Sequence, residues 1–155
     1  MKELLDYRQR LIARLAAAAE EFCAACEALD DPHASPGGDS WNAHQLAAHT
    51  RDVQREVYGQ RIRRTAEEHE PSFEDFDAEA WNQAQYRSDE PLESILDELR
   101  LAVGECASLL RELPAASWSR ESSHSAYGCG FTLQTWVERA LAHIEEHLES
   151  VRRLA

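Results

Sequence analysis

The sequence predicts an all-α protein that folds as a single four-helix bundle over residues 1–155. Four long segments repeat apolar residues every three or four positions, the period of a helix buried along one face. The chain has only 6 glycines and 5 prolines, and alanine, leucine, glutamate and arginine, which favour helices, are abundant. No segment shows the alternating pattern of a strand. Four amphipathic helices in one domain bury their apolar faces against one another, which makes a bundle.

The first helix is expected at residues 1–30 and the second at residues 40–67. The apolar stripe of the first helix is Leu4, Leu11, Leu15, Ala18, Phe22, Cys26 and Leu29. The segment DDPHASPGGDS then interrupts the helical pattern with prolines and glycines. Ser40 is a favourable N-cap, so we place the start of the second helix there.

The third helix is expected at residues 90–113, with Pro91 in a first turn that accepts proline and Pro114 just beyond the end. The fourth is expected at residues 132–154. The stripe of the third is Ile95, Leu99, Val103, Cys106, Leu110 and Leu113; that of the fourth is Leu133, Trp136, Ala140, Ile144, His147 and Val151. The connections HEPSFEDFDAEAWNQAQY, which encloses a short helix, and PAASWSRESSHSAYGCG are long. They predict long crossings rather than tight hairpins.

Charge and composition exclude several classes of partner. The formal net charge of −13 disfavours binding to nucleic acid or to an anionic membrane. No apolar run is long enough to span a bilayer. The start MKELLDYRQR has no signal-peptide pattern, so we expect a cytoplasmic protein.

Cys23 and Cys26 form a CxxC pattern inside the first helix. The chain contains no second CxxC, and no strand precedes this one. We therefore interpret both cysteines as free apolar thiols packed in a helix interface rather than as a metal or redox pair.

His143 and His147 are one helical turn apart in LAHIEEHLES. At about 100° per residue, His147 lies near the centre of the apolar stripe of the fourth helix and His143 lies towards its edge. In the second helix, His49 lies on the inward face, whereas His44 lies about 140° from it. The remaining histidines, His33, His69 and His124, fall in loop-like stretches and are expected to be solvated.

Three inward-facing histidines from two helices suit zinc or a similar divalent ion and leave a coordination position open. Because imidazole must be neutral to bind a metal, release is expected below about pH 6. The alternative is that each histidine is an ordinary core or boundary residue. Nearby, Glu146 either orients His143 or is solvated, and Arg139 either holds a carboxylate or lies on the surface.

Three motifs resemble the DinB-like family of metal-binding four-helix bundles. SWNAHQLAAHTRDV resembles its second-helix signature, in which a tryptophan precedes a ligand histidine by eight residues, here Trp41 and His49. LAHIEEHLESV is similar to the H-x-x-x-H of its last helix. FDAEAWNQAQY, with Asp77, Trp81 and Asn82, resembles a segment of the related mycothiol-dependent maleylpyruvate isomerases.

The resemblance implies metal ligands at His49, His143 and His147, with zinc, nickel or iron as the divalent metal. It also implies the DinB/YfiT-like bundle connectivity and a homodimer. Some relatives, including bacillithiol transferase-like proteins, use a low-molecular-weight thiol with the metal to transfer or isomerise a small molecule.

The leading hypothesis for function is a metal-dependent thiol transferase or isomerase that acts on a small-molecule substrate, in which Tyr58 and Trp136 could form apolar walls of the site. Trp41 is interpreted as a core residue. One alternative is a metal-dependent hydrolase with Glu146 or another carboxylate as base. Another is a metal-binding stress-response or interaction protein without turnover.

Overall fold

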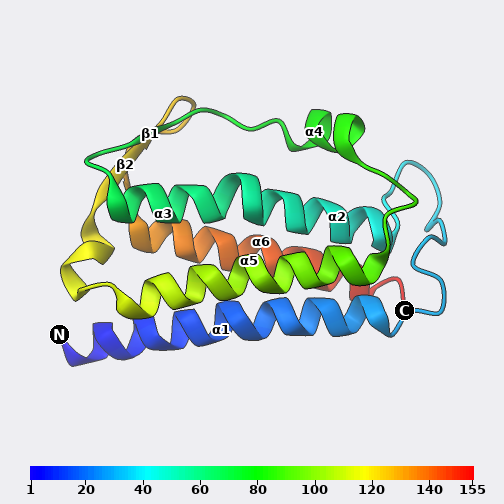
Figure 1. The fold of residues 1–155 in the computed structure, drawn as a ribbon, viewed down its shortest axis with the longest axis horizontal. Helices are drawn as coiled ribbons and strands as arrows, with labels where there is room; N and C mark the ends of the chain where they lie inside the picture. Colours follow the sequence, from blue (N-terminus) through cyan, green and yellow to red (C-terminus); the bar gives the residue numbers. More distant parts are fainter.

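Four long helical rods lie side by side along the molecule in the computed structural model, which describes residues 1–155 (Figure 1). The first is α1 (Lys2–Glu27), the third is α5 (Leu92–Glu112) and the fourth is α6 (Leu133–Arg152). The second is a continuous rod made of α2 (Ala43–Val53), a π-helical turn η1 (Gln54–Tyr58) and α3 (Gly59–Glu67). The predicted all-α four-helix bundle is confirmed.

The directions of the rods differ from those of a simple up-and-down bundle. Figure 1 shows α1 and α6 running one way, while α2–α3 and α5 run the other way. The chain leaving α3 must therefore return along the whole bundle before α5 can begin. It returns through β1 (Ser72–Phe73) and α4 (Ala78–Gln85), which lie over α2–α3. This is a long crossing of the predicted kind.

The core runs along the inner faces of all four rods. Its largest fully buried side chains include Trp136 of α6 and Phe22 of α1. Cys23 and Cys26 are free and buried in this core, and burial raises the pKa of each thiol to about 12. The interpretation of both as packed free thiols is confirmed. None of the helices combines the length and apolar character needed to span a membrane.

A small sheet at one end of the bundle corrects the expectation that no strands form. β1 pairs in parallel with β2 (Glu121–His124), and β2 pairs in antiparallel with β3 (Gly128–Thr132). These strands have two to five residues and are rich in serine and glycine, so they carry no apolar alternation. Pairing with the other segments, rather than local propensity, makes them strands. The sheet joins the crossover to the segment before α6.

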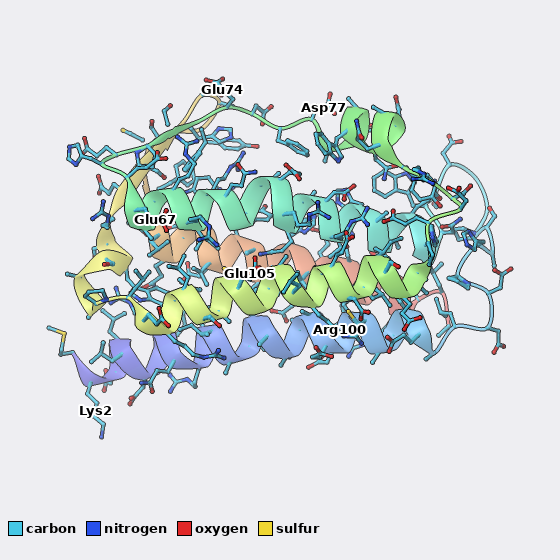
Figure 2. All side chains as sticks on the ribbon, viewed as in Figure 1. Lys2, Glu67, Glu74, Asp77, Arg100 and Glu105 are labelled. Carbon is cyan, nitrogen blue, oxygen red and sulfur yellow. The ribbon has the colours of Figure 1, made fainter.

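Polar contacts shape the crossover and hold it on α2. Asp77 caps α4 by accepting a hydrogen bond from Ala80 N at 3.0 Å, and Figure 2 labels it at the start of this helix. Trp81 Nε1 donates to Asp52 Oδ2 at 3.2 Å. His44, which is fully buried, lies 2.8 Å from the Tyr86 hydroxyl through Nδ1. Its Nε2 lies 2.7 Å from the carbonyl oxygen of Glu90. His44 therefore has a structural role.

The long connection from α5 to α6 begins with η2 (Ala115–Ser119), a 3-10 turn, and continues through β2 and β3. Pro114 precedes it, as expected for a residue that cannot continue a helix. Trp118 of this turn is buried against the core, and the guanidinium carbon of Arg8 lies 5.3 Å from its ring centroid. The turn closes the same end of the bundle as the small sheet.

Candidate metal centre

Helix capping sets the positions of the site helices. Asn42 caps α2 through its side chain, which accepts a hydrogen bond from Gln45 N at 2.8 Å. The Gln45 side chain accepts in return from Asn42 N at 3.0 Å. The predicted cap at Ser40 is therefore two residues early. In α6, Thr132 caps the helix by accepting from Thr135 N at 3.2 Å.

The three predicted histidines converge between α2 and α6. His49 Nε2 lies 3.1 Å from His143 Nε2, and His147 Nε2 lies 3.1 Å from the same atom. One candidate ligand atom from each of the three residues lies within 4.8 Å of the others. His49 is buried, and His143 and His147 are half-buried. The structure thus brings together the side chains that the inward-facing pattern selected.

Burial makes all three imidazoles neutral at pH 7. Desolvation, strengthened by the nearby His147, lowers the pKa of His49 to about 4 and that of His143 to about 2. Burial also lowers the pKa of His147, although the adjacent Glu146 acts in the opposite direction. The expected release of a metal below about pH 6 assumed ordinary imidazoles. With these lowered pKa values, His49 and His143 become protonated only at a lower pH than ordinary histidines, so acid should release the metal at a lower pH as well.

The donor set fits a divalent metal ion. A neutral imidazole has one N–H and one lone pair, so mutual hydrogen bonds cannot satisfy three Nε2 atoms that face one another. One cation can satisfy all three lone pairs. Each Nδ1 then carries the proton, and the buried Nδ1 of His147 has no hydrogen-bond partner in the protein. These are soft-to-borderline nitrogen ligands of the kind that zinc, nickel and iron accept.

Two cavities meet at the histidine cluster. One, of about 290 Å³, is lined by all three histidines together with Tyr58 and side chains of α3, the crossover and the β2–β3 hairpin. The other, of about 670 Å³, is lined by His49, His147 and Trp41. The cluster is therefore open to small molecules on two sides, as a chemical site requires.

The other predicted site residues have mixed outcomes. Tyr58 lines the smaller cavity, with its ring centroid 5.6 Å from that of His143. Trp136 does not line it, because its ring is fully buried and its Nε1 donates to Ser122 Oγ at 2.7 Å. Trp41 packs on the core as expected, and its ring also lies 5.0 Å from His49. Glu146 is exposed and makes no hydrogen bond to His143.

Arg61 and His124 line the smaller cavity, and neither was predicted as a site residue. His124 was expected to be solvated but is only 3% exposed, because β2 places it in the sheet. On a regular helix Arg61 would lie about 120° around from His49. The extra residue of the π-turn removes about 100° of that angle. The turn leaves no room for a side chain at Gly59, because a Cβ there would lie 2.7 Å from Gln54 O. The glycine inside a predicted helix is therefore the one sign of the turn in the sequence.

Comparison with known proteins agrees with this architecture. The family model described as the DinB superfamily matches residues 14–151. Among solved structures, YfiT from Bacillus subtilis, described as a probable metal-dependent hydrolase with an unusual four-helix bundle topology, is similar in fold. The TM-score is 0.78 at 21% identity, over 94% of this chain and 86% of that chain. No curated protein sequence matches. With a family model that spans nearly all of the bundle, the chain belongs to the DinB superfamily.

Proposed function

We propose that His49, His143 and His147 bind one divalent metal ion and that residues 1–155 act as one bundle domain around it. The observation that carries the proposal is the convergence of three neutral imidazole Nε2 atoms at the meeting point of two cavities. Zinc, nickel and iron suit this donor set. Metal analysis of the purified protein, followed by titration of metal-free protein with each ion, tests this step.

We further propose that the metal-bound protein is a thiol transferase or isomerase that uses a low-molecular-weight thiol. A bound divalent cation lowers the pKa of a thiol and favours the thiolate, which is the nucleophilic form. The thiol proton leaves to solvent, and the sulfur forms a bond to an electrophilic carbon of the substrate. In a transfer the leaving group departs with its electron pair; in an isomerisation the thiol is expelled again after bond rotation.

The chain's own residues supply binding and orientation for this reaction. Tyr58 forms a wall of the smaller cavity, and burial raises the pKa of its hydroxyl, so it stays a neutral hydrogen-bond donor at pH 7. Trp41 lines the larger cavity beside His49. We assign the larger cavity to the thiol cofactor and the smaller one to the electrophile, because the cofactor is the bulkier molecule.

A metal-dependent hydrolase is the second candidate, and the description of YfiT as a probable metal-dependent hydrolase supports it. A hydrolase of this kind needs a general base near the metal. Glu146 is exposed and makes no hydrogen bond to the cluster, and Asp75 is the one carboxylate that lines the smaller cavity. Asp39 and Glu79 line the larger cavity, and neither makes a hydrogen bond to a histidine of the cluster. Because no carboxylate is held against the cluster, we place thiol chemistry first. Hydrolysis of a panel of esters without added thiol would instead place the hydrolase ahead of the thiol transferase.

A metal-binding module without turnover is the third candidate. It predicts full metal occupancy with no reaction in either panel. A panel of thiols, including bacillithiol, mycothiol and glutathione, combined with electrophiles such as maleyl compounds and alkyl halides, separates the three candidates. Thiol-dependent turnover that disappears in His143→Ala supports the first.

We also propose a cytoplasmic homodimer that acts on a small molecule and binds neither nucleic acid nor membranes. The net charge of −13 supports the last two points. The dimer rests on the family resemblance alone. Light scattering coupled to size-exclusion chromatography measures the mass, which for a dimer is twice 17.6 kDa.

A further inference from the structure

Arg61 is a buried guanidinium without a carboxylate partner. Its side chain lies between the rings of Trp136 and Phe73, with the guanidinium carbon 4.8 and 5.8 Å from the two centroids. The residue is 8% exposed, and Nη2 donates to Glu74 O at 3.2 Å. Nε and Nη1 make no hydrogen bond, and no carboxylate lies within 4.0 Å. A buried charge without an opposite charge is costly, so a ligand that supplies one would bind favourably here.

His124 presents a second donor to the same point. Its Nδ1 accepts hydrogen bonds from the backbone nitrogens of Ala126 and Tyr127 at 3.1 and 3.3 Å. The proton of the neutral ring is therefore on Nε2. Nε2 lies 3.3 Å from Arg61 Nη2, which also carries hydrogens. Two donors that face each other are both satisfied when one acceptor binds between them.

Asp75 is the nearest carboxylate to this pair of donors. Its Oδ1 lies 3.9 Å from His124 Nε2, which is beyond hydrogen-bond distance, and its side chain is 69% exposed. Asp75 therefore does not satisfy the donors in this arrangement. It stands at the edge of the cavity, where an incoming anion can displace it towards solvent.

Arg139 adds a second cation to the cavity. Its guanidinium carbon lies 5.5 Å from the Tyr127 ring centroid and 5.0 Å from that of Phe131, and it makes no ion pair. Burial lowers the pKa of Arg61; the charge of Asp75 raises it, and the positive charge of Arg139 lowers it. The smaller cavity thus has two arginines and one aspartate in a chain of net charge −13.

We propose that Arg61, Arg139 and the Nε2–H of His124 bind the carboxylate of a small organic acid. Guanidinium groups match the planar geometry of a carboxylate and bind it through paired N–H donors. The cavity of about 290 Å³ is also lined by His143 and His147, so the remainder of the acid extends towards the histidine cluster. That this acid is the substrate of the protein rests on the proposed function; the anion site itself does not.

The test is calorimetric titration of the full, metal-free protein with benzoate, benzamide and inorganic phosphate. Benzoate and benzamide have nearly the same shape, and only benzoate is charged. We expect benzoate to bind at least tenfold more tightly than benzamide or phosphate. Arg139→Gln and Arg61→Gln should each weaken benzoate about tenfold, the loss of a charge-assisted hydrogen bond. Arg63→Gln, an exposed change on the same helix, should leave it within twofold.

Four results would overturn the proposal. They are equal binding of benzoate and benzamide, binding of phosphate in preference to benzoate, unchanged benzoate binding in Arg139→Gln, and benzoate binding only after zinc is added. Arg139 is exposed, so Arg139→Gln tests the proposal even where Arg61→Gln does not fold. Zinc titrations of the same proteins keep the two proposals apart. Failure of the parent to bind zinc while it still binds benzoate removes the metal centre and leaves the anion site.

Discussion

The Nε2 atoms of His49 and His143 lie 3.1 Å apart although the two residues are separated by 94 positions in the chain. This contact joins the second and fourth rods of the bundle through two polar rings whose pKa values burial has lowered. Two packed apolar side chains would join the helices at a lower cost in free energy, because a buried polar group must find a hydrogen-bond partner. The arrangement is therefore better explained by binding of a ligand than by stability.

Acid should destabilise the metal-free protein between pH 7 and pH 5. The folded-state pKa of His49 is about 4, against 6.5 for an ordinary histidine, so the unfolded chain takes up protons first. Stability is then full above about pH 6.5 and falls as the pH decreases towards 4. His49 alone contributes a loss of about 2 kcal/mol by pH 5. Urea unfolding at both pH values measures it.

The matched control is His49→Ala, whose loss over the same range should be smaller by about that amount. In the metal-loaded parent, a metal should remain bound at pH 5, because His49 and His143 are still neutral there. Equal stability of the metal-free parent at pH 7 and 5 would contradict the lowered pKa values.

Gly59→Ala should destabilise the protein although alanine favours helices. A Cβ at this position would lie 2.7 Å from Gln54 O in the π-turn, so the turn must rearrange, at a cost of about 1–3 kcal/mol. Gly104→Ala in α5 is the matched control, because nothing lies within 4 Å of its Cβ. That change should stabilise by about 1 kcal/mol. Thermal unfolding of both variants checks the pair, and stabilisation by both would argue against the π-turn.

His44→Ala should lower stability without changing metal binding. The change leaves the Tyr86 hydroxyl and the Glu90 carbonyl oxygen without a partner and creates a cavity under the crossover. We expect a loss of about 2–4 kcal/mol in the free energy of unfolding. The metal-to-protein ratio of the folded variant should equal that of the parent. Loss of metal from folded His44→Ala would show that the crossover, or His44 itself, belongs to the metal site.

Only one thiol per chain should react quickly with Ellman's reagent in the folded protein. Cys129 is exposed, whereas Cys23, Cys26 and Cys106 are buried, and burial raises the pKa of each of these three to about 12. All four should react in urea. The double variant Cys23→Ala, Cys26→Ala should bind metal like the parent. Fast reaction of two or more thiols, or loss of metal from the double variant, would contradict this assignment.

The periodicity of apolar residues was sufficient to predict the four rods and the inward position of His49, His143 and His147. Both depend on the 3.6-residue period, which is a local property of the chain. Arg61 escaped prediction because the π-turn at Gln54–Tyr58 changes that period, and His124 escaped because its strand forms only by pairing with β1 and β3. The anion site therefore depends on tertiary structure, whereas the histidine cluster was visible in sequence.

Titration of metal-free protein with zinc at pH 7 tests the central claim most directly, with His49→Ala and His69→Ala as the matched pair. His69 is an exposed histidine, with 94% of its side chain accessible, so its change controls for the loss of a histidine as such. The account predicts one tight zinc site per chain in the parent and in His69→Ala, and binding at least a hundredfold weaker in His49→Ala. Helical circular dichroism should persist in all three metal-free proteins, because the bundle has its own core. Parent-like zinc binding by His49→Ala would contradict the account.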